Sequence, residues 1–342
     1  MDIRSEFTDL LGEIEAEMRS VLAEQDGRAR PLYEMLGYHL GLDQPDGPRG
    51  KRMRPLLGLL AYQSLTGDYR AALPGAAAVE LGHNFSLVHD DIEDADRERR
   101  HRPTLWAIWG VPLAINAGDA LFALSRLALY RLLEDGFSER RVLALMRVYD
   151  ETCLALCEGQ FLDISFERRT DITVEEYLDM IARKTAALVG ASVQAGAILA
   201  TDDAATIEAY RQFGYHLGLA FQMADDVKGT FWSSAESGKP EAGDVRKRKK
   251  TLPLVWALEH GGPDDVERLR EIYAGGQATE GPMSQPDVDA VLEILVRCGA
   301  RERAQDEARR YRDMALADVE HLPISEERRG ELRSLMGSVI AL

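Results

Sequence analysis

The sequence is poor in cysteine. Its 342 residues include only Cys153, Cys157 and Cys298. Cys153 and Cys157 are one helical turn apart, but no second pair is present to complete a zinc site. A chain of this length buries about 75% of its extended surface and needs no covalent staples for stability. We therefore expect buried, reduced thiols and a cytoplasmic protein.

Long apolar runs are also missing. The longest stretch without a charged side chain spans residues 185–201 and includes Ser192 and Gln194. It is shorter than the roughly 20 apolar residues that cross a membrane as a helix. Acidic residues are spread through the first 18 residues, which is not typical of a signal peptide. We expect no membrane span and no secretory leader.

The third scarcity is basic charge. The chain has 41 Lys and Arg against 58 Asp and Glu, for a net charge of −17. A dedicated nucleic-acid binder neutralises phosphates with a surplus of cations, so we expect no nucleic-acid partner. The run of basic residues at 246–250 is then most simply loop charge in contact with solvent. A small anionic ligand would still require cations gathered locally.

Period-two alternation is absent as a sustained pattern, and apolar residues recur at three and four positions. Met53, Leu56, Leu57 and Leu60 follow such a stripe, and Gly67 stands where that helix would end. We predict an all-α protein. No loop is long or biased enough to be a domain linker, so residues 1–342 are predicted to form one large helical bundle.

Two acidic clusters break the amphipathic pattern. One apolar helix is expected to begin near Gly75 and run into Asp90, Asp91 and Asp94; another ends in Asp225 and Asp226. Carboxylates near a helix C-terminus are disfavoured by about 0.3–1 kcal/mol each, and adjacent ones repel. Bound cations would offset this cost. Asp oxygens at i and i+4 suit Mg²⁺, which shares its ligand shell with substrate phosphates. The alternative is a pair of solvated helix ends.

Cations stand near both clusters. Lys51 and Arg54 lie one turn apart at an expected helix start, Arg99 and Arg100 follow the first cluster, and Lys239 and the run at 246–250 follow the second. Arg offers bidentate donors to phosphate, and Lys offers a point charge. Acids with nearby cations are what a metal-bridged diphosphate requires.

Taken in order, these motifs resemble those of the trans-isoprenyl diphosphate synthases of the polyprenyl synthetase family. The elements are GKRMRP at 50–55, DDIED at 90–94 followed by Arg99-Arg100, GQFLD at 159–163, Lys184-Thr185, FQMADD at 221–226 and GKPEAGD at 238–244 followed by KKTLP at 249–253. The match covers about residues 45–260. Residues 263–342 add C-terminal helices without a recognised motif.

The resemblance implies a helical fold of the isoprenoid synthase type with a central active-site cavity. It implies a Mg²⁺-dependent 1′–4 condensation of isopentenyl diphosphate with allylic diphosphates, with three ions present when substrate is bound. It also implies a homodimer. No nucleophilic side chain is needed, because the allylic C–O bond ionises and the released pyrophosphate accepts the proton.

Residue roles follow from the same resemblance. The expected metal ligands are Asp90, Asp91, Asp94, Asp225 and Asp226. The expected isopentenyl diphosphate ligands are Lys51, Arg54, His83 and Arg100. The expected allylic diphosphate ligands are Arg99, Lys184, Thr185, Gln222, Lys239 and Lys249, of which Thr185 and Gln222 also steady the allylic cation. Gly229 departs from the pattern, because the second motif usually ends in a third Asp.

Product length is expected to depend on Phe85, five residues before Asp90, with Ser86 beside it. In this family a bulky side chain there caps the growing chain. A short-chain product is therefore expected, with C20 favoured and C15 close. The alternative is that Phe85 is a core residue, as is usual for Phe at helical spacing, and both roles are compatible.

Two other functions remain open. A class I terpene cyclase shares the fold and the metal-assisted ionisation but has no use for an isopentenyl diphosphate pocket. A non-catalytic partner subunit of a heteromeric synthase would have a broken first motif, and here that motif is intact.

Overall fold

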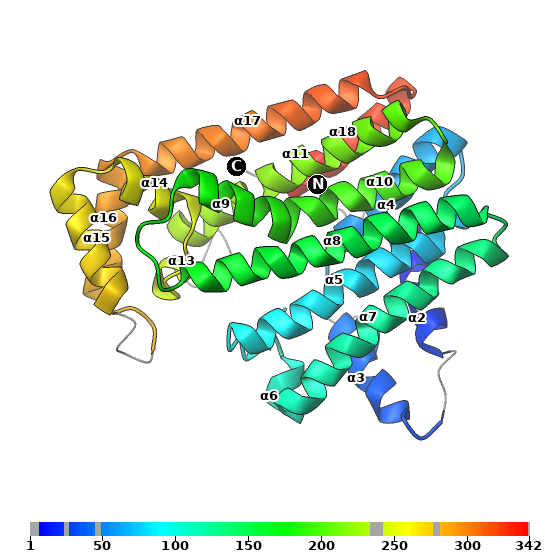
Figure 1. The fold of residues 1–342 in the computed structure, drawn as a ribbon, viewed down its shortest axis with the longest axis horizontal. Coiled ribbons are helices and arrows are strands. Elements are labelled where there is room, and N and C mark those ends of the chain that lie inside the picture. The colour runs from blue at the N-terminus through cyan, green and yellow to red at the C-terminus, as the bar shows by residue number, and fades with distance from the viewer. Residues whose placement is uncertain (1–6, 24–26, 45–48, 233–241, 276–280, 341–342) are drawn as a thin grey trace. The chain divides into compact units, whose positions relative to one another are not determined.

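The computed structural model describes residues 7–23, 27–44, 49–232, 242–275 and 281–340, and these are helical almost throughout (Figure 1). The first helices are α2 Thr8–Ala23, α3 Arg30–Leu40, α4 Met53–Thr66, η1 Arg70–Ala72, α5 Leu73–Glu93, α6 Leu105–Trp109, α7 Val111–Glu134 and α8 Glu139–Phe166. The remaining helices are α9 Val174–Ile181, η2 Ala182–Ala186, α10 Ala187–Ala200, α11 Ala204–Phe231, α13 Gly243–Arg246, α14 Leu252–His260, α15 Pro263–Gly275, α16 Gln285–Arg297, α17 Ala300–His321 and α18 Glu326–Val339. The all-α prediction is confirmed.

The chain divides into two compact units. Unit one comprises Met1–Cys153, Ala191–Arg211 and His321–Ser338. Unit two comprises Leu154–Gly190, Gln212–Glu320 and Val339–Leu342. The single domain and its central cavity remain predictions.

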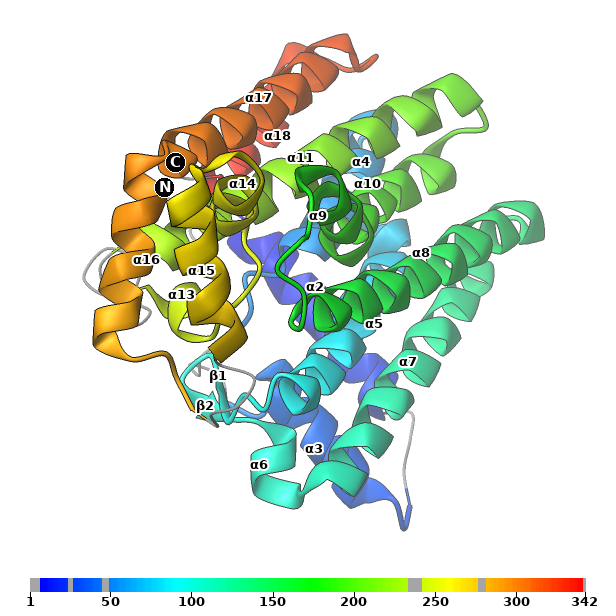
Figure 2. The same ribbon diagram turned by 60° about the vertical axis from the view of Figure 1, so that its left-hand side comes forward.

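Helix α5 is the centre of unit one. It packs along α7, and the two helices run side by side in both views (Figures 1 and 2). It also contacts α2 and α4. Most of its side chains are buried, as expected for a helix that is apolar on nearly every side. Apart from the buried Glu80, its acidic residues come in the last turn, so the core packing of α5 fixes where they lie.

A short β-hairpin follows α5. Strands β1 (Glu98–Arg99) and β2 (Arg102–Pro103) pair antiparallel between the end of α5 and α6 (Figure 2). The two turn residues, Arg100 and His101, have φ of 54° and 60°. Positive φ costs a non-glycine residue roughly 1–2 kcal/mol, and such strain tends to persist at functional sites. The sequence did not predict these strands, because two residues are too few to show a period-two pattern.

Unit two is organised around α14, which packs on α9, α15 and α16. Fully buried side chains such as Leu269 and Val291 form one apolar cluster there, and Met223 and Val255 belong to a second. The second cluster includes residues of α11 beside the acidic motif. Helices α15, α16 and α17 follow in this unit, up to Glu320.

The helix boundaries refine several predictions. Helix α4 begins at Met53, so Lys51 precedes it; the helix ends at Thr66, before Gly67 with φ of 86°. Helix α11 continues to Phe231, beyond the predicted end at Asp226.

The three cysteines are free. Cys153 is buried and Cys298 half-buried, but Cys157 is exposed, so the expectation of burial is wrong there. Helix α8 is not apolar on both sides at that position. Among the described residues, no helix is long and apolar enough to cross a membrane.

Candidate active site

The first aspartate motif lies where α5 ends. Asp90 and Asp91 occupy its last turn, and Asp94 is the residue that caps it. The Asp94 backbone N–H donates to the Asp90 carbonyl at 2.8 Å, so the helical spacing of the two carboxylates persists. Asp90 and Asp94 are half-buried, whereas Asp91 is only 2% exposed. Adjacent positions in this motif therefore differ in access to solvent.

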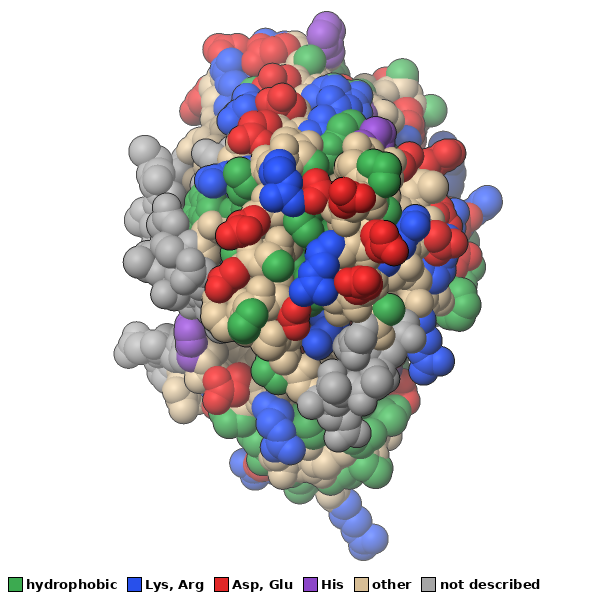
Figure 3. Space-filling view, turned by 90° about the vertical axis from the view of Figure 1, so that its left-hand side faces the viewer, with side chains coloured by type: hydrophobic (Ala, Val, Ile, Leu, Met, Phe, Trp, Pro, Cys, Tyr) green, Lys and Arg blue, Asp and Glu red, His purple; other side chains and the backbone are tan. Residues whose placement is uncertain are grey.

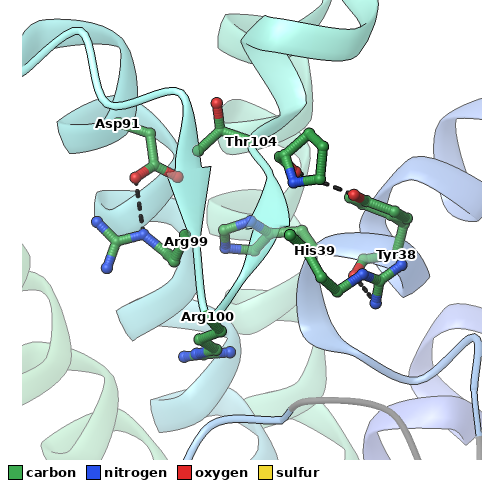
Figure 4. A pocket seen from close by; sticks show the side chains of 8 residues that line it. Tyr38, His39, Asp91, Arg99, Arg100 and Thr104 are labelled. Atoms are coloured by element: carbon green, nitrogen blue, oxygen red, sulfur yellow. Dashed lines mark hydrogen bonds and ion pairs between the residues drawn. The ribbon is translucent and has the colours of Figure 1, made fainter. Parts of the chain in front are cut away.

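Asp91 is tied to the hairpin. Arg99 Nε donates to Asp91 Oδ1 at 2.7 Å, and Figure 4 shows the two side chains facing each other. The second oxygen, Oδ2, is buried without a hydrogen-bond partner. Burial raises the pKa of Asp91 to about 6, although Arg99 opposes this shift. The ion pair with Arg99 therefore leaves one half of the buried carboxylate unsatisfied, which costs free energy.

A group of cations lies beside this motif in unit one. Arg54 Nη1 is 3.1 Å from His83 Nε2. Burial, with the charges of Arg54 and Arg100, holds the pKa of His83 well below its usual range. His83 is therefore neutral and its Nε2 accepts from Arg54. Burial also lowers the pKa of both Arg54 and Arg100 to about 10, so the two guanidiniums stay charged at pH 7.

The structure thus brings together three of the four predicted isopentenyl diphosphate ligands, Arg54, His83 and Arg100. Lys51 precedes α4 and is exposed. Two or more desolvated arginines around a neutral imidazole favour a dianionic ligand.

The contact of Gly50 with Arg100 explains why the motif at 50–55 begins with glycine. A Cβ built there would lie 2.7 Å from Nη2 and 2.9 Å from Cζ of Arg100. Any side chain at this position would displace the guanidinium. The glycine therefore lets the loop before α4 approach the hairpin turn closely.

Sequence reasoning missed the group that anchors this cation cluster. Arg52 is 3% exposed and Glu80 is 2% exposed. Arg52 Nη1 donates to Glu80 Oε1 at 2.7 Å, and Arg52 also donates to the Leu40 carbonyl. The side chain of Glu80 further accepts from Asn84 at 3.0 Å. The only signal was a Glu in the middle of the apolar α5 sequence.

A small cavity of about 20 Å³ lies behind the arginines. Its lining includes Tyr38, His39, Asp91, Arg99 and Arg100 (Figure 4). Burial and the nearby arginines lower the pKa of His39 to about 3, so it adds no charge. The cavity has room for about one water molecule, not for a diphosphate. This cavity is therefore not the binding site of the diphosphate.

The second group of predicted residues lies in unit two. Lys184 and Thr185 belong to η2, a π-helical turn, which is a distortion frequent at functional sites. Lys184 forms an ion pair with Asp163. Thr185 Oγ1 donates to Gln222 Oε1 at 2.8 Å, and Gln222 Nε2 donates to an oxygen of Asp226 at 2.9 Å. These bonds fix the Gln222 amide.

Asp226 is the buried member of the second pair. Its Oδ2 accepts from the Tyr177 hydroxyl at 2.6 Å and from the Leu252 N–H at 2.9 Å. It is 6% exposed, and burial raises its pKa to about 7. Asp225 beside it is half-buried. Tyr177 was not singled out in the sequence, because nothing local links it to a residue 49 positions away.

The last predicted ligands lie further along unit two. Lys249 is exposed, and its backbone N–H donates to the Asp244 carbonyl at 2.9 Å. Lys239 lies outside the described residues. The role predicted for each lysine stays a prediction.

Phe85 and Ser86 lie on α5 in unit one. Phe85 is 8% exposed, and its ring meets Phe122 of α7 edge-on with 5.2 Å between centroids. Ser86 Oγ donates to the His83 carbonyl at 2.9 Å. Phe85 is a core residue, which leaves its predicted effect on product length open.

The donor set decides which kind of metal would fit. Within the described residues, no group of three or more His, Cys, Asp or Glu converges in a way that would hold an ion by itself. Mg²⁺ does not need such a cage, because it binds one or two carboxylates together with phosphate oxygens. The carboxylates of Asp90, Asp94 and Asp225 are half-buried and fit a Mg²⁺ ion that arrives with a phosphate ligand.

Surface charge supports a local rather than a global anion site. On the face shown in Figure 3, the described acidic and basic side chains are interspersed. The half-buried cluster of Arg54, Arg99 and Arg100 differs from this surface because it gathers charge of one sign.

Comparison with known proteins identifies the family. Residues 39–291 match the polyprenyl synthetase family. The (2E,6E)-farnesyl diphosphate synthase of Mycobacterium tuberculosis is 38% identical over 328 residues, covering 94% of this chain and 89% of that protein. A geranylgeranyl diphosphate synthase of the same organism is 40% identical over 301 residues, covering 86% and 83%.

Solved structures agree. Geranylgeranyl pyrophosphate synthetase from Pyrococcus horikoshii superimposes with a TM-score of 0.88 at 32% identity, covering 99% of this chain and 98% of that one. Polyprenyl synthase from Caulobacter crescentus, complexed with calcium and isoprenyl diphosphate, gives 0.83 at 28% identity, covering 100% and 97%. The chain belongs to the polyprenyl synthetase family.

Proposed function

We propose that this prenyltransferase carries out the Mg²⁺-dependent 1′–4 condensation of isopentenyl diphosphate with allylic diphosphates, with a C20 product favoured and C15 close. Its relatives are short-chain prenyl diphosphate synthases of both product lengths. The observation that carries the proposal is the half-buried cluster of Arg54, neutral His83 and Arg100 beside the first aspartate motif. It is suited to a second diphosphate, which a cyclase does not bind.

In the proposed reaction, Arg54, His83 and Arg100, with Lys51 at the exposed edge, bind the diphosphate of isopentenyl diphosphate. Burial makes this binding stronger than it would be in water, because few water molecules compete for the guanidinium donors. The neutral imidazole of His83 fixes the Arg54 guanidinium. The double bond of the acceptor is thereby oriented for attack.

The allylic diphosphate is bound by the other cations, namely Arg99, Lys184, Lys239 and Lys249. Its C–O bond breaks, C1 of the allyl group joins C4 of isopentenyl diphosphate, and one proton leaves to the released pyrophosphate. Mg²⁺, when bound, neutralises the diphosphate and makes pyrophosphate a better leaving group. The oxygens of Thr185 and Gln222 face the developing positive charge.

Asp90, Asp94 and Asp225 are the proposed direct metal ligands, because these carboxylates are half-buried rather than enclosed. Asp91 and Asp226 were predicted as ligands too. Their burial and their bonds to Arg99, Tyr177 and the Leu252 backbone favour a role in positioning their neighbours. A Mg²⁺ count of three remains part of the proposal, by the family resemblance.

Phe85 is proposed to limit product length. It lies on α5 five residues before Asp90 and packs against Phe122. Phe85→Ala would open space along this helix, and we expect longer products in a radiolabelled product assay. Ser86→Ala, the neighbouring small-to-small change, serves as the control. Unchanged chain length in Phe85→Ala would contradict the assignment.

A homodimer is proposed from the family and from exposed apolar side chains in unit one. Large apolar side chains of α6, α7 and the start of α8 are 40–64% exposed, and a partner subunit would cover some of them. They are Ile108, Val111, Leu113, Ile115, Leu127, Tyr130 and Leu143. Light scattering should give twice the chain mass, and Leu127→Glu should shift it toward the monomer. A monomeric wild type would contradict the homodimer.

We also propose a cytoplasmic location, which is expected from the reduced thiols.

The deciding experiment incubates purified protein with geranyl diphosphate and Mg²⁺, with and without isopentenyl diphosphate. A prenyl diphosphate product that requires both substrates is expected. Hydrocarbon from geranyl diphosphate alone would identify a terpene cyclase instead. No turnover by the wild type under either condition would favour the partner-subunit hypothesis. Asp90→Ala is the control, because its pyrophosphate release defines the background of the assay.

A further inference from the structure

Helix α2 carries a carboxylate on its buried face. Leu11, Ile14 and Met18 of this helix are buried, and Glu15 lies among them with 5% of its surface exposed. A carboxylate in such a place costs free energy unless cations and hydrogen-bond donors offset it. The position of Glu15 therefore requires a cationic partner from another element.

The partners of Glu15 come from the loop before α4. Arg49 Nη1 donates to Glu15 Oε2, and Arg52 Nε lies 3.7 Å from Glu15 Oε1. The side chain of Arg52 is buried and that of Arg49 is largely so, which means that water screens these charges only weakly. The two ion pairs join the N-terminal helix to the motif at 50–55.

Arg52 is held from α5 as well. It has φ of 52°, a conformation that disfavours a residue with a Cβ, and its guanidinium donates to Glu80 of α5 at 2.7 Å. Glu80 and His83 lie about one turn apart on α5, and His83 contacts Arg54. The loop therefore docks on two successive turns of α5 through Arg52 and Arg54, and on α2 through Arg49.

The two buried carboxylates divide the cations of this region into two groups. Arg49 and Arg52 form ion pairs with Glu15 or Glu80. Within the described part of the chain, three further cations have no ion pair with a carboxylate, and these are Lys51, Arg54 and Arg100. An anionic ligand would meet these three cations, whereas the paired arginines fix the loop that carries two of them.

We propose that Glu15 is a positioning residue for isopentenyl diphosphate, and that α2 thereby forms part of the pocket for this substrate. Glu15 does not touch the ligand. It holds Arg49 and Arg52, and they fix the backbone on which Lys51 and Arg54 stand. The inference rests on the proposed function, which assigns these two cations to the diphosphate of isopentenyl diphosphate.

The test measures binding of this substrate directly. Isothermal titration calorimetry with isopentenyl diphosphate, in the absence of an allylic substrate, gives a dissociation constant without turnover. Glu15→Gln keeps the shape of the side chain and removes its charge, and Arg49→Gln removes its partner at a less buried position. Glu17→Gln is the matched control, because Glu17 is another carboxylate of α2 that pairs with an arginine, Arg131 of α7.

We expect Glu15→Gln and Arg49→Gln each to raise the dissociation constant about 10-fold, because charge-assisted hydrogen bonds to a diphosphate depend on where the cations are held. Glu17→Gln should leave it within about twofold of wild type, since this ion pair lies away from the loop. In steady-state assays, KM for isopentenyl diphosphate should rise in the first two variants while KM for geranyl diphosphate stays unchanged. A loss of stability alone would not produce this split.

Thermal unfolding accompanies each measurement, and Glu15→Gln and Glu17→Gln should both unfold at a lower temperature than wild type. Unchanged affinity in Glu15→Gln would overturn the inference, and so would an equal loss of affinity in Glu17→Gln. If Glu15→Gln does not fold, Arg49→Gln decides alone, and unchanged affinity in that variant would overturn the inference.

Failure of the proposed function gives a different result. Wild-type protein would then not bind isopentenyl diphosphate at all, which would overturn the proposed function and the inference with it. If wild type binds and Glu15→Gln binds equally well, the proposed function stands and only the inference fails.

Discussion

The two Asp-Asp pairs are identical in sequence but are held by different partners. In each pair the first residue, Asp90 or Asp225, is half-buried, and the second, Asp91 or Asp226, is buried. Asp91 is held by one cation, Arg99, and has an oxygen without a partner. Asp226 is held by neutral donors on both oxygens.

This difference indicates two ways to position an exposed carboxylate. In unit one, a partly buried ion pair links α5 to the hairpin that carries Arg100. In unit two, a network of neutral hydrogen bonds links α11 to α9 and to the start of α14. A buried ion pair adds little net stability but is costly to break, whereas a satisfied neutral network gives a rigid arrangement. The buried members therefore serve geometry and the exposed members serve chemistry.

The largest expected effect is on kcat, and it comes from replacing the half-buried first residue of each Asp-Asp pair. Asp90→Asn and Asp225→Asn should each lower kcat about 100-fold or more, because several kcal/mol of charge stabilisation is lost and 1.36 kcal/mol corresponds to tenfold. Their unfolding temperatures should change little. The measurement is steady-state pyrophosphate release with both substrates.

Asp91→Asn and Asp226→Asn provide the contrast. We expect these variants to lower the unfolding temperature while keeping the wild-type Mg²⁺ half-saturation concentration. A rise of that concentration equal to the rise in Asp90→Asn or Asp225→Asn would break the comparison and make all four residues ligands.

The buried Lys250 of unit two gives a test of how burial shifts a pKa and thereby the pH dependence of stability. It is 5% exposed, and burial lowers its pKa to about 8 from 10.5. The unfolded chain therefore binds more protons between pH 8 and 10.5, so this residue makes stability rise with pH across that window. Below pH 8 the buried charge costs up to about 3 kcal/mol, by 1.36 kcal/mol per pKa unit.

The measurement is urea unfolding of wild type and Lys250→Met from pH 7 to 10.5. The variant should be the more stable at pH 7, and the difference should shrink as pH rises above 8. A difference that is constant with pH would contradict the assignment, whatever the packing contributed by the Tyr273 ring 4.5 Å from Nζ.

A smaller effect is expected for Tyr177→Phe, which removes one donor from Asp226. The free energy of unfolding should fall by about 1 kcal/mol, because Asp226 Oδ2 loses one of its two donors and keeps the Leu252 N–H. kcat should fall severalfold, since Gln222 depends on Asp226. Tyr210→Phe is the matched control, because Tyr210 is also buried and its hydroxyl bonds Ser64 in unit one. Equal kcat losses in both variants would contradict a positioning role for Tyr177.

Much of this site could be predicted from the sequence. Helical spacing predicted that Asp90 and Asp94 share a face, and the family resemblance gave the Arg54–His83–Arg100 group, which comes from three different elements. The sequence could not distinguish Asp90 from Asp91, since burial depends on side chains brought in from elsewhere. Arg52–Glu80 and Tyr177–Asp226 are bonds across 28 and 49 residues, respectively, and no local pattern encodes them.

Gly229 is a second example of contacts that the sequence does not show. The sequence marked a missing carboxylate, and only the fold showed that Asp244 reaches the same place. A motif defined by neighbours in the chain does not describe a site defined by neighbours in space.

The most direct test of the central claim is chromatography of the products from dimethylallyl diphosphate and radiolabelled isopentenyl diphosphate. The account predicts all-trans products of C15 to C20 that appear only when both substrates and Mg²⁺ are present. Labelled product formed without the allylic substrate or without a divalent cation, or no product at all, would contradict it.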